Sequence, residues 1–280
     1  MKRIMSIQDI SCVGKCSLTV ALPIISAAGI ETSIVPTAVL STHTQFSGFT
    51  FRDLTDDMDP IKEHWKKEGF KFEAIYTGYL GSEHQIDIVK DYFDTFGGNG
   101  TAIIMDPAMA DNGKLYTGFD ENFALAMASL CGKADIILPN ISEACLMLGK
   151  DYPGEEADEE TIKALLTDLS GLGAKISVIT GVSLGKDKIG FMGYDSRTQE
   201  FFKYGTDMVP YKSHGTGDVF ASAFTGAYVC GESIYDALCI AADYTARCIS
   251  NTYNEKDHVN YAVNFELELP YYMKRLGKKL

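Results

Sequence analysis

This 280-residue sequence lacks the marks of a secreted, membrane-spanning or disulfide-stabilised protein. Its seven cysteines are odd in number and contain no C-x-x-C pair, a pattern that favours reduced thiols. Cys12 and Cys16 are compatible with a metal pair, although small packing residues are the better interpretation. The basic start loses its apolar character at Gln8 and Asp9, and no window is apolar for the length of a membrane span. These absences predict a soluble, cytoplasmic protein without a membrane partner.

Positive charge is also scarce. The formal net charge is −13 and the pI is about 4.8, which argues against nucleic acid as a partner because such binding needs a basic face. A nucleotide is not excluded, since a helix N-terminus and a divalent cation can hold phosphates in an acidic protein. Neither G-x-x-x-x-G-K-[ST] nor G-x-G-x-x-G occurs, so the common phosphate-binding loops are missing.

The order of apolar segments predicts an α/β fold. Strands and helices alternate over the first 180 residues, as expected for a mostly parallel sheet with helices on both faces. A late hairpin predicts antiparallel strands at one edge, and no linker or repeat divides residues 1–280, which predicts one domain. The expected strands are 4–7, 33–40, 74–78, 101–105, 134–138, 176–180, 188–194 and 199–205; the expected helices are 15–28, 58–68, 83–96, one from 142, 158–172, 217–230 and 233–250.

Polar residues stand where several of these strands end. In doubly wound sheets, ligands bind beyond the carboxyl ends of the strands, so such residues are expected to gather at one edge. The residues concerned are Asp9, Thr44, Tyr79, Asp106, Asn140 and Thr180.

The segment 214–224, His-Gly-Thr-Gly-Asp-Val-Phe-Ala-Ser-Ala-Phe, carries the strongest local signal. Gly215 and Gly217 allow the backbone to turn, and the helix that follows offers unpaired N–H groups to an anion. Asp218 in the first turn is suited to take a proton from a hydroxyl that attacks phosphorus. The alternative is a plain turn in which Asp218 only complements the helix dipole.

Taken with its context, this segment resembles the anion hole and catalytic base of the ribokinase-like superfamily. Further segments resemble its pyridoxal kinase branch, in the family's order and approximate spacing, from about residue 4 to 252. They are Ser6-Ile7-Gln8-Asp9 with Val13-Gly14, Ser41-Thr42-His43-Thr44, Thr77-Gly78-Tyr79-Leu80, Asp106-Pro107 and Pro139-Asn140-x-x-Glu143-Ala144.

The resemblance implies an ATP-dependent kinase of B6 vitamers that acts on their 5′-hydroxymethyl group. Asp218 would be the general base, and the backbone of Gly215, Thr216 and Gly217 would stabilise the transferring phosphoryl group. The resemblance also implies a homodimer and leaves a monovalent cation open. The residues expected to contact the pyridine substrate are Asp9, His43, Thr44 and Tyr79.

The same resemblance implies a nucleotide site with Mg²⁺. Asp106 and Glu143 would organise the ion, through waters. Asn140 and Thr180 would meet the phosphates. Asp111 belongs to a segment, 107–118, that resembles a loop folding over the ligands, and Val209 belongs to one that flanks the adenine.

Several of these residues also have structural interpretations that the sequence leaves open. Asn140 and Glu143 are equally compatible with a helix cap, and Tyr79 with an ordinary core aromatic. His43 is compatible with a loop histidine whose ring nitrogens are satisfied, and Thr180 with a plain strand end.

The sequence departs from the family pattern at Asp9. Eukaryotic pyridoxal kinases resemble this sequence but carry serine there, whereas aspartate is typical of sugar and pyrimidine kinases of the superfamily. Hydroxymethylpyrimidine kinase is therefore the nearest alternative. A vitamin- or nucleotide-binding protein without turnover is less favoured, because it needs no base, and a dinucleotide-dependent oxidoreductase lacks its fingerprint.

Overall fold

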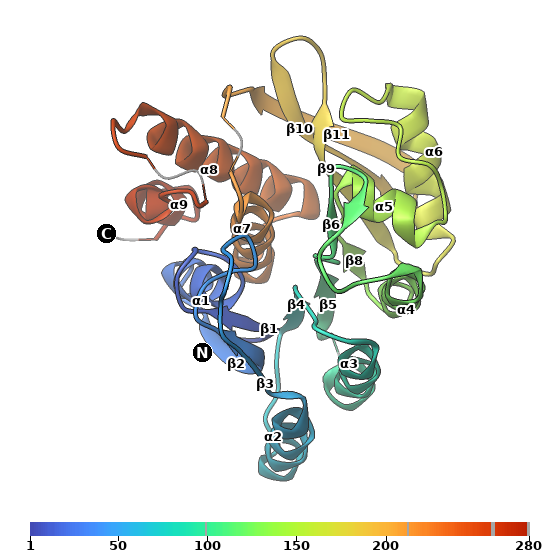
Figure 1. Ribbon diagram of the computed structural model, residues 1–280, viewed down its shortest axis with the longest axis vertical. Helices are drawn as coiled ribbons and strands as arrows, with labels where there is room; N and C mark the ends of the chain where they lie inside the picture. The colour runs from blue at the N-terminus through green and yellow to red at the C-terminus, as the bar shows by residue number, and fades with distance from the viewer. Residues whose placement is uncertain (99, 212, 259–260, 279–280) are drawn as a thin grey trace. The chain divides into compact units, whose positions relative to one another are not determined.

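The first strand, β1 (Arg3–Ser11), begins an apolar run in which Ile4, Met5 and Ile7 are fully buried. In the computed structural model, which describes residues 1–98, 100–211, 213–258 and 261–278, the chain forms two compact units. Unit 1 comprises Met1–Tyr76 with Met208–Leu280, and unit 2 comprises Thr77–Asp207 (Figure 1). Each unit is described separately.

Unit 1 is built on parallel strands. β1 pairs with β2 in parallel, with Arg3 opposite Glu31 and Ile7 opposite Val35, and the strand order is β4-β1-β2-β3. The short β3 pairs antiparallel with β2. Continuous apolar runs such as that of β1 are typical of parallel strands covered on both faces. The bounds are β2 (Glu31–Leu40), β3 (Phe51–Asp53) and β4 (Ala74–Thr77), whose last residue is counted with unit 2.

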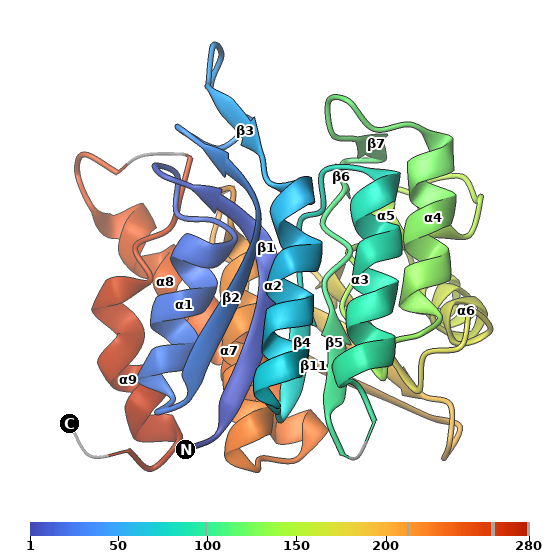
Figure 2. The same cartoon turned by 90° about the horizontal axis from the view of Figure 1, so that it is seen from below.

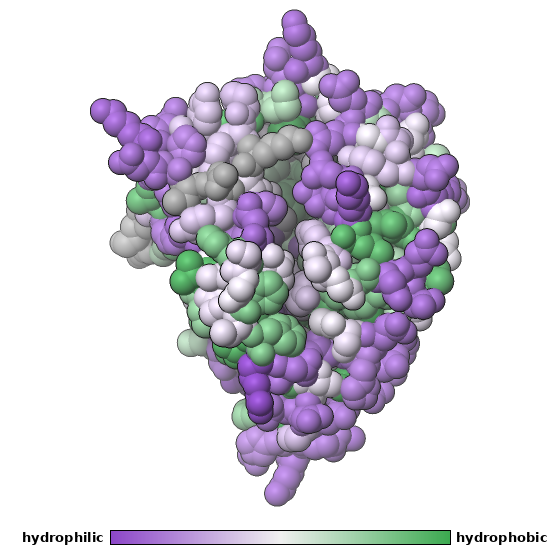
Figure 3. Space-filling view, viewed as in Figure 1, coloured by the Kyte–Doolittle hydropathy of each residue, from purple (hydrophilic) through white to green (hydrophobic). Residues whose placement is uncertain are grey.

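Helices cover both faces of the unit 1 strands. α1 packs against α7, and α7 against α8, on one face, while α2 lies on the other (Figure 2). Only Met58 and Lys62 of α2 are buried, and its outer side is strongly hydrophilic (Figure 3), as expected for an exposed helix. The bounds are α1 (Leu18–Ala27), α2 (Thr55–Glu68), α7 (Thr216–Cys230), α8 (Ile234–Asn254), the 3₁₀ turn Glu266–Glu268 and α9 (Leu269–Arg275).

Unit 2 carries the antiparallel edge. Its strand order is β11-β10-β9-β8-β5, with parallel pairing from β5 to β9 and antiparallel pairing from β9 to β11. The strands are β5 (Ala102–Met105), β8 (Ile136–Ile137), β9 (Ile176–Ser183), β10 (Lys188–Asp195) and β11 (Glu200–Asp207), with a separate hairpin of β6 (Ala110–Asp111) and β7 (Lys114–Leu115). The helices are α3 (Glu83–Phe96), α4 (Glu121–Cys131), α5 (Ile141–Met147) and α6 (Glu159–Ser170).

The predicted α/β class, with mostly parallel pairing and an antiparallel edge, is confirmed. The prediction missed α4, α9, β3 and the β6–β7 hairpin, and it ended α8 at residue 250 although the helix continues to Asn254. All seven cysteines are free, as expected. Among the described residues, no helix has the length and apolar character needed to cross a membrane. The single-domain expectation for residues 1–280 stays a prediction.

Candidate active site

Asp9 lies inside β1, where the pairing with β2 is irregular. Gln8 is opposite Pro36 but Ile10 is opposite Val39, so one residue of β1 faces two of β2. Such a bulge re-aims the side chain at its centre. Asp9 is 4% exposed and accepts a hydrogen bond of 2.9 Å from the Ser11 hydroxyl. Burial raises the pKa of its carboxyl, and hydrogen bonds from Ser17 and Ser11 partly offset this.

His43 is a buried, neutral histidine with both ring nitrogens occupied. Its Nδ1 accepts from the Gln45 N–H at 3.2 Å, so Nε2 carries the proton and donates to the Tyr261 carbonyl at 3.1 Å. Burial lowers its pKa, which keeps the ring neutral. A Cβ on Gly14, whose φ is 137°, would lie 2.1 Å from the ring. The hydrogen bonds with Gln45 and Tyr261 and the close packing against Gly14 therefore fix the neutral His43 ring in place. The adjacent Thr44 is exposed.

Two aromatic residues that the sequence prediction missed lie beside His43. The Phe46 ring centroid is 5.1 Å from that of His43 and 5.0 Å from that of Tyr261. The His214 ring, from the glycine-rich segment, is 5.9 Å from His43. These four rings form a cluster on one side of the 214–218 segment. The S-x-H-T pattern at residues 41–44 was the only sequence signal for this aromatic cluster.

The start of α7 follows a left-handed residue, Gly215, at φ 77°. A Cβ there would lie 2.5 Å from the Lys15 carbonyl oxygen, so only glycine fits. Thr216 is already the first helical residue, and Gly217 lies within the helix without a positive φ. The expectation that both glycines form the turn is thus wrong for Gly217, because one left-handed residue suffices to end the loop.

Asp218 lies in the first turn of α7, close to Asp9. Burial raises the pKa of its carboxyl to about 7; a hydrogen bond from the Ser17 N–H opposes the shift, and the charge of Asp9 adds to it. A base with a pKa near the operating pH is suited to accept a proton in catalysis. The Cys16 thiol lies between these groups, and burial together with the charges of Asp218 and Asp9 raises its pKa, so it stays protonated.

The raised pKa of Asp218 predicts the pH dependence of turnover. If its ionised form accepts the proton, kcat/KM should rise with pH through about 7 and then level off. One pH unit below that midpoint, activity should be roughly a tenth of the plateau. Asp9→Asn removes a charge that raises the Asp218 pKa, so its profile should shift to lower pH. Profiles of both proteins check this, and a flat profile between pH 5.5 and 8 would contradict it.

In unit 2, Asn140 and Glu143 form a capping box at the start of α5. The Asn140 side chain accepts from the Glu143 N–H at 2.9 Å, and Glu143 Oε2 accepts from the Asn140 N–H at 2.8 Å. Glu143 Oε1 accepts from the Met109 N–H at 3.1 Å. Burial raises the pKa of Glu143 to about 8, and these backbone hydrogen bonds oppose the shift. The helix-cap interpretation of both residues is thus confirmed.

Asp106 directly follows β5 and is 7% exposed. Asp106 and Glu143 both lie close enough to the buried Cys131 to raise the pKa of its thiol. The described residues hold no group of three or more histidine, cysteine or acidic side chains that could bind a metal alone. Two carboxylates suit a Mg²⁺ ion that takes its other ligands from phosphates and water. Because both Glu143 oxygens accept backbone N–H groups, its contact with such an ion would run through water.

Asn140 and Thr180 are brought side by side. They form an isolated parallel bridge, in which the Thr180 N–H donates to the Pro139 carbonyl at 2.9 Å. The Asn140 amide also donates to the Ala110 carbonyl at 2.9 Å, which ties the strand end to the hairpin that carries Asp111. β9 continues past Thr180 to Ser183, so Thr180 is not a strand end as expected.

The hairpin turn within the predicted 107–118 loop consists of Asn112 and Gly113, at φ 52° and 74°. Two positive φ values are typical of a type I′ turn. The Gly113 N–H donates to the Ser142 hydroxyl at 2.8 Å, so the hairpin is pinned to α5. Asp111 is exposed on it and its charge raises the pKa of Glu143. The sequence prediction treated this segment as a loop and missed the hairpin.

Two predicted site residues, Tyr79 and Val209, remain to be placed. Tyr79, in unit 2, is half-buried, with its ring centroid 5.5 Å from that of Phe119. Val209, in unit 1, is half-buried, and its carbonyl accepts from the Tyr211 N–H at 2.7 Å. Unit 1 thus gathers Asp9, His43, Gly215 and Asp218, and unit 2 gathers Asp111, Asn140, Glu143 and Thr180. That the two sets meet at one edge stays a prediction.

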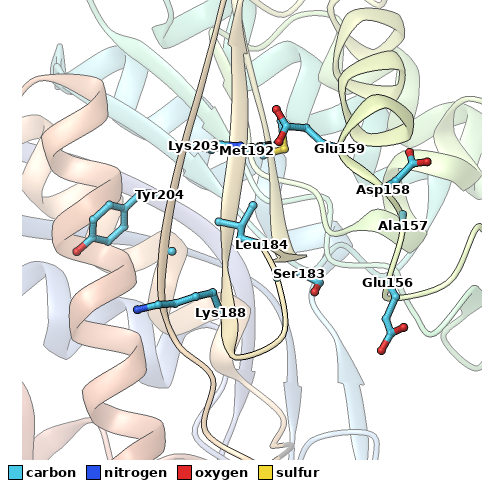
Figure 4. Close-up of a pocket in the computed structure, with 12 residues that line it drawn as sticks. Glu156, Ala157, Asp158, Glu159, Ser183, Leu184, Lys188, Met192, Lys203 and Tyr204 are labelled. Atoms are coloured by element: carbon cyan, nitrogen blue, oxygen red, sulfur yellow. Dashed lines mark hydrogen bonds and ion pairs between the residues drawn. The ribbon is translucent and has the colours of Figure 1, made fainter.

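Unit 2 also holds a cavity of about 600 Å³ that includes none of these residues. It lies beside the β9–β10 turn and the start of α6, and Glu156 and Asp158 of the segment just before that helix line it (Figure 4). Met192 and Lys203, which pair across β10 and β11, line it. The Thr180 side chain belongs to the opposite face of the strands, because it pairs with Phe191, the neighbour of Met192.

Comparison with known proteins supports a kinase. The phosphomethylpyrimidine kinase family model matches residues 27–264. A candidate phosphomethylpyrimidine kinase from Bacteroides thetaiotaomicron, crystallised in a form with pyridoxal, is 37% identical, with a TM-score of 0.91 over 100% of this chain and 96% of that one. A pyridoxal kinase from Lactobacillus plantarum is 28% identical, with a TM-score of 0.88 over 98% and 97%.

Among sequences, a candidate pyridoxine kinase from Staphylococcus aureus is 30% identical over 67% of this chain and 66% of its own length. The ribokinase-like fold inferred from the sequence motifs is confirmed by these structures. The family match covers most of the chain, including the start of α7 with Asp218, but begins after Asp9. The chain therefore belongs to the phosphomethylpyrimidine kinase family and is a small-molecule kinase of the pyridoxal kinase type.

Proposed function

We propose that this protein phosphorylates the 5′-hydroxymethyl group of a B6 vitamer (pyridoxal, pyridoxamine or pyridoxine) with ATP as donor. The observation that carries the proposal is Asp218, a carboxyl with a pKa of about 7 in the first turn of a helix entered through Gly215. The names of the relatives support the vitamer, as does the pyridoxal in the Bacteroides crystal form.

In the proposed reaction, the vitamer hydroxyl oxygen attacks the γ-phosphorus of ATP and ADP leaves. The hydroxyl proton passes to the ionised Asp218 carboxylate, so Asp218 is protonated at the end of the step. The first N–H groups of α7, at Thr216 and Gly217, have no acceptor within the helix, so they would donate to the negative charge that develops on the transferring group. Gly215 allows the chain to enter α7 here, because a side chain at this position would clash with the Lys15 carbonyl oxygen.

The residues that we expect to contact the vitamer are Asp9, His43, Thr44 and Tyr79. Asp9 would contact the pyridine ring or its substituents through its carboxylate. The neutral His43 ring would pack against the vitamer, and the exposed Thr44 would contact it from the solvent side. Tyr79 would contribute its ring or hydroxyl. Because Asp9 is buried beside a second carboxyl, the pocket favours a ligand group that is positively charged or a strong hydrogen-bond donor.

The nucleotide is assigned to Asn140, Thr180, Asp111 and Val209. Mg²⁺, bound with the nucleotide, would supply charge neutralisation between the phosphates. Asp106 would hold it directly or through water, and Glu143 through water. Glu143 also fixes the end of the 107–109 segment through its hydrogen bonds to Met109 and Asn140.

Removal of these carboxylates should change the metal dependence. Asp106→Ala should lower activity and raise the Mg²⁺ concentration that gives half-maximal activity, since the ion loses a hard oxygen ligand. Glu143→Ala should do the same and also lower the melting temperature, because it leaves buried N–H groups unpaired. Mg²⁺ titrations of activity measure this, with Glu121→Ala on the exposed start of α4 as control. Superimposable titration curves in all three variants would remove both residues from the metal site.

Three further expectations complete the proposal. We propose that residues 1–280 work as one kinase domain, that two copies form a homodimer, and that the protein acts in the cytoplasm without a nucleic acid or membrane partner. The free cysteines and the acidic composition support the last point.

Hydroxymethylpyrimidine kinase is the second candidate, favoured by the matched family's description and by the aspartate at position 9. It shares the reaction and the base, so only the ring pocket separates the two. The test is ADP release from MgATP with each B6 vitamer, hydroxymethylpyrimidine and ribose. The highest kcat/KM on a vitamer supports the proposal; the highest on hydroxymethylpyrimidine favours the alternative. No release with any of them would favour a binding protein without turnover.

A further inference from the structure

Lys15, which the sequence prediction did not single out, lies in the turn after β1 between two elements of the candidate site. The His43 N–H donates to the Val13 carbonyl at 3.1 Å, and a Cβ on Gly14 would lie 2.1 Å from the His43 ring. On the other side, a Cβ on Gly215 would lie 2.5 Å from the Lys15 carbonyl oxygen. A shift of this short turn would therefore move the His43 ring and the entry to α7 together.

The backbone of Lys15 needs support to keep this place. Its φ is 50°, in the left-handed region that few residues other than glycine adopt. Such a conformation costs free energy and persists only where the surrounding structure holds it. The contacts of the Lys15 side chain supply that support.

The half-buried Lys15 side chain ties the turn to the C-terminal part of unit 1. Its Nζ donates to Asn264 Oδ1 at 2.7 Å and to Glu266 Oε2 at 2.9 Å, and it lies 5.8 Å from the centroid of the Phe265 ring. A single exposed ion pair contributes little, but several partners around one charge fix its position. Three consecutive residues thus hold one ammonium group.

These anchoring residues are themselves fixed to α8. The Asn264 N–H donates to the Thr252 hydroxyl at 2.8 Å, and its side-chain amide donates to Glu255 at 2.6 Å. The Phe265 carbonyl accepts from the buried Tyr244 hydroxyl at 2.9 Å. The partners of the ammonium group therefore form a fixed support.

The same C-terminal segment also holds His43 directly. His43 Nε2 donates to the Tyr261 carbonyl at 3.1 Å, three residues before Asn264. The ring is thus fixed along two routes, one through Tyr261 and one through Gly14 and Lys15. Loss of the second route would leave the ring without its packing partner on the side of the turn.

We propose that Lys15 is a positioning residue for the vitamer site, whose ammonium group ties the turn after β1 to Asn264 and Glu266 and so fixes His43 and Gly215. The inference rests on the proposed function, in which His43 packs against the vitamer and Gly215 opens the helix that carries the base. Lys15 acts through these two residues and is assigned no contact with the substrate.

The kinetic test uses Lys15→Met, which keeps the apolar stem and loses the ammonium group. KM for the vitamer should rise about fivefold, the scale of a partly exposed ion pair, and kcat should fall by a smaller factor. KM for MgATP should not change, because Asn140 and Thr180, which are expected to meet its phosphates, lie in unit 2. An unchanged vitamer KM, or an equal rise of both KM values, would overturn the proposal.

Two further variants separate the ammonium group from a general loss of charge. Lys15→Arg keeps the charge and the donors, so its vitamer KM should stay within about twofold of wild type. Lys71→Met, at an exposed position between α2 and β4, is the matched control and should match wild type. A vitamer KM that rises as much in Lys71→Met as in Lys15→Met would overturn the proposal, because net charge alone would then explain the effect.

A double-mutant cycle tests whether Lys15 acts through its C-terminal partner. Glu266→Ala should raise the vitamer KM in the same direction, because the ammonium group loses one of its two acceptors. In the Glu266→Ala background, Lys15→Met should have a smaller effect than in wild type. Fully additive effects would overturn the proposal, since they would show that the two side chains act independently.

A last readout does not depend on turnover. NMR of histidine-labelled protein without ligand reports the surroundings of the His43 ring, with its signals assigned by His43→Gln. These signals should shift in Lys15→Met and stay unchanged in Lys71→Met. Unchanged His43 signals in Lys15→Met would overturn the role of Lys15. A wild-type protein without turnover on any vitamer would overturn the proposed function, while the ring signals would still decide whether Lys15 positions His43.

Discussion

Asp218→Asn should reduce kcat by ~10²–10⁴, the usual range for loss of a general base, with little change in vitamer binding. Asparagine has nearly the same shape as aspartate and still offers an acceptor oxygen, but it cannot take up the substrate proton. The substitution also removes a buried acidic group whose pKa is raised, so the fold should not be weakened.

Steady-state kinetics with MgATP and a saturating vitamer measure this effect, and calorimetry measures vitamer binding. Asp187→Asn, at an exposed position between β9 and β10, is the matched control for a lost aspartate charge and should keep wild-type kcat. An Asp218→Asn protein that retains more than about a tenth of wild-type kcat would exclude Asp218 as the base.

Asp9→Ser should change vitamer preference more than overall activity. Asp9 is buried, so its ionised form is costly without a partner, and a protonated ring nitrogen or aminomethyl group supplies one. A hydrogen bond to a charged group contributes roughly 1.5–3 kcal/mol. Because each 1.4 kcal/mol is about tenfold in kcat/KM, the wild type should favour pyridoxamine over pyridoxal, and Asp9→Ser should shrink that preference by about tenfold or more.

The ratio of kcat/KM for the two vitamers, in both proteins, checks this expectation. The structure also shows a competing role, since Asp9 accepts a hydrogen bond from the Ser11 hydroxyl and so anchors the end of β1. An unchanged ratio in Asp9→Ser together with a lower melting temperature would assign Asp9 to that anchoring role alone.

The sequence predicted the elements whose signals are local and strong. Apolar runs located β1 and β9, although β1 continues to Ser11 and β9 to Ser183, beyond the predicted ends at residues 7 and 180. The hairpin of β10 and β11 was placed within two residues of its observed bounds. α9 was missed because seven residues with a proline give too little helical periodicity to detect. The β6–β7 hairpin was missed because two-residue strands have no pattern of their own, although Asn112-Gly113 is a strong turn signal.

The candidate site was predictable only in part. The motif around Asp218 located the start of α7, which carries the proposed base, because a helix start after glycine is a local feature. Phe46 and Tyr261 were not found, since their place beside His43 depends on chain folding that no spacing in the sequence reveals. For Asn140 and Glu143 the sequence left two interpretations open, a helix cap and a phosphate or metal site, and the structure shows the capping box.

The central claim is that this chain makes a phosphorylated B6 vitamer. The most direct measurement is chromatography with mass spectrometry of the products formed by the purified protein from MgATP and each vitamer. The account predicts a vitamer 5′-phosphate formed in equal amount with ADP, and no such product from Asp218→Asn beyond its residual rate. ADP without a phosphorylated vitamer, or a product only from hydroxymethylpyrimidine, would contradict it.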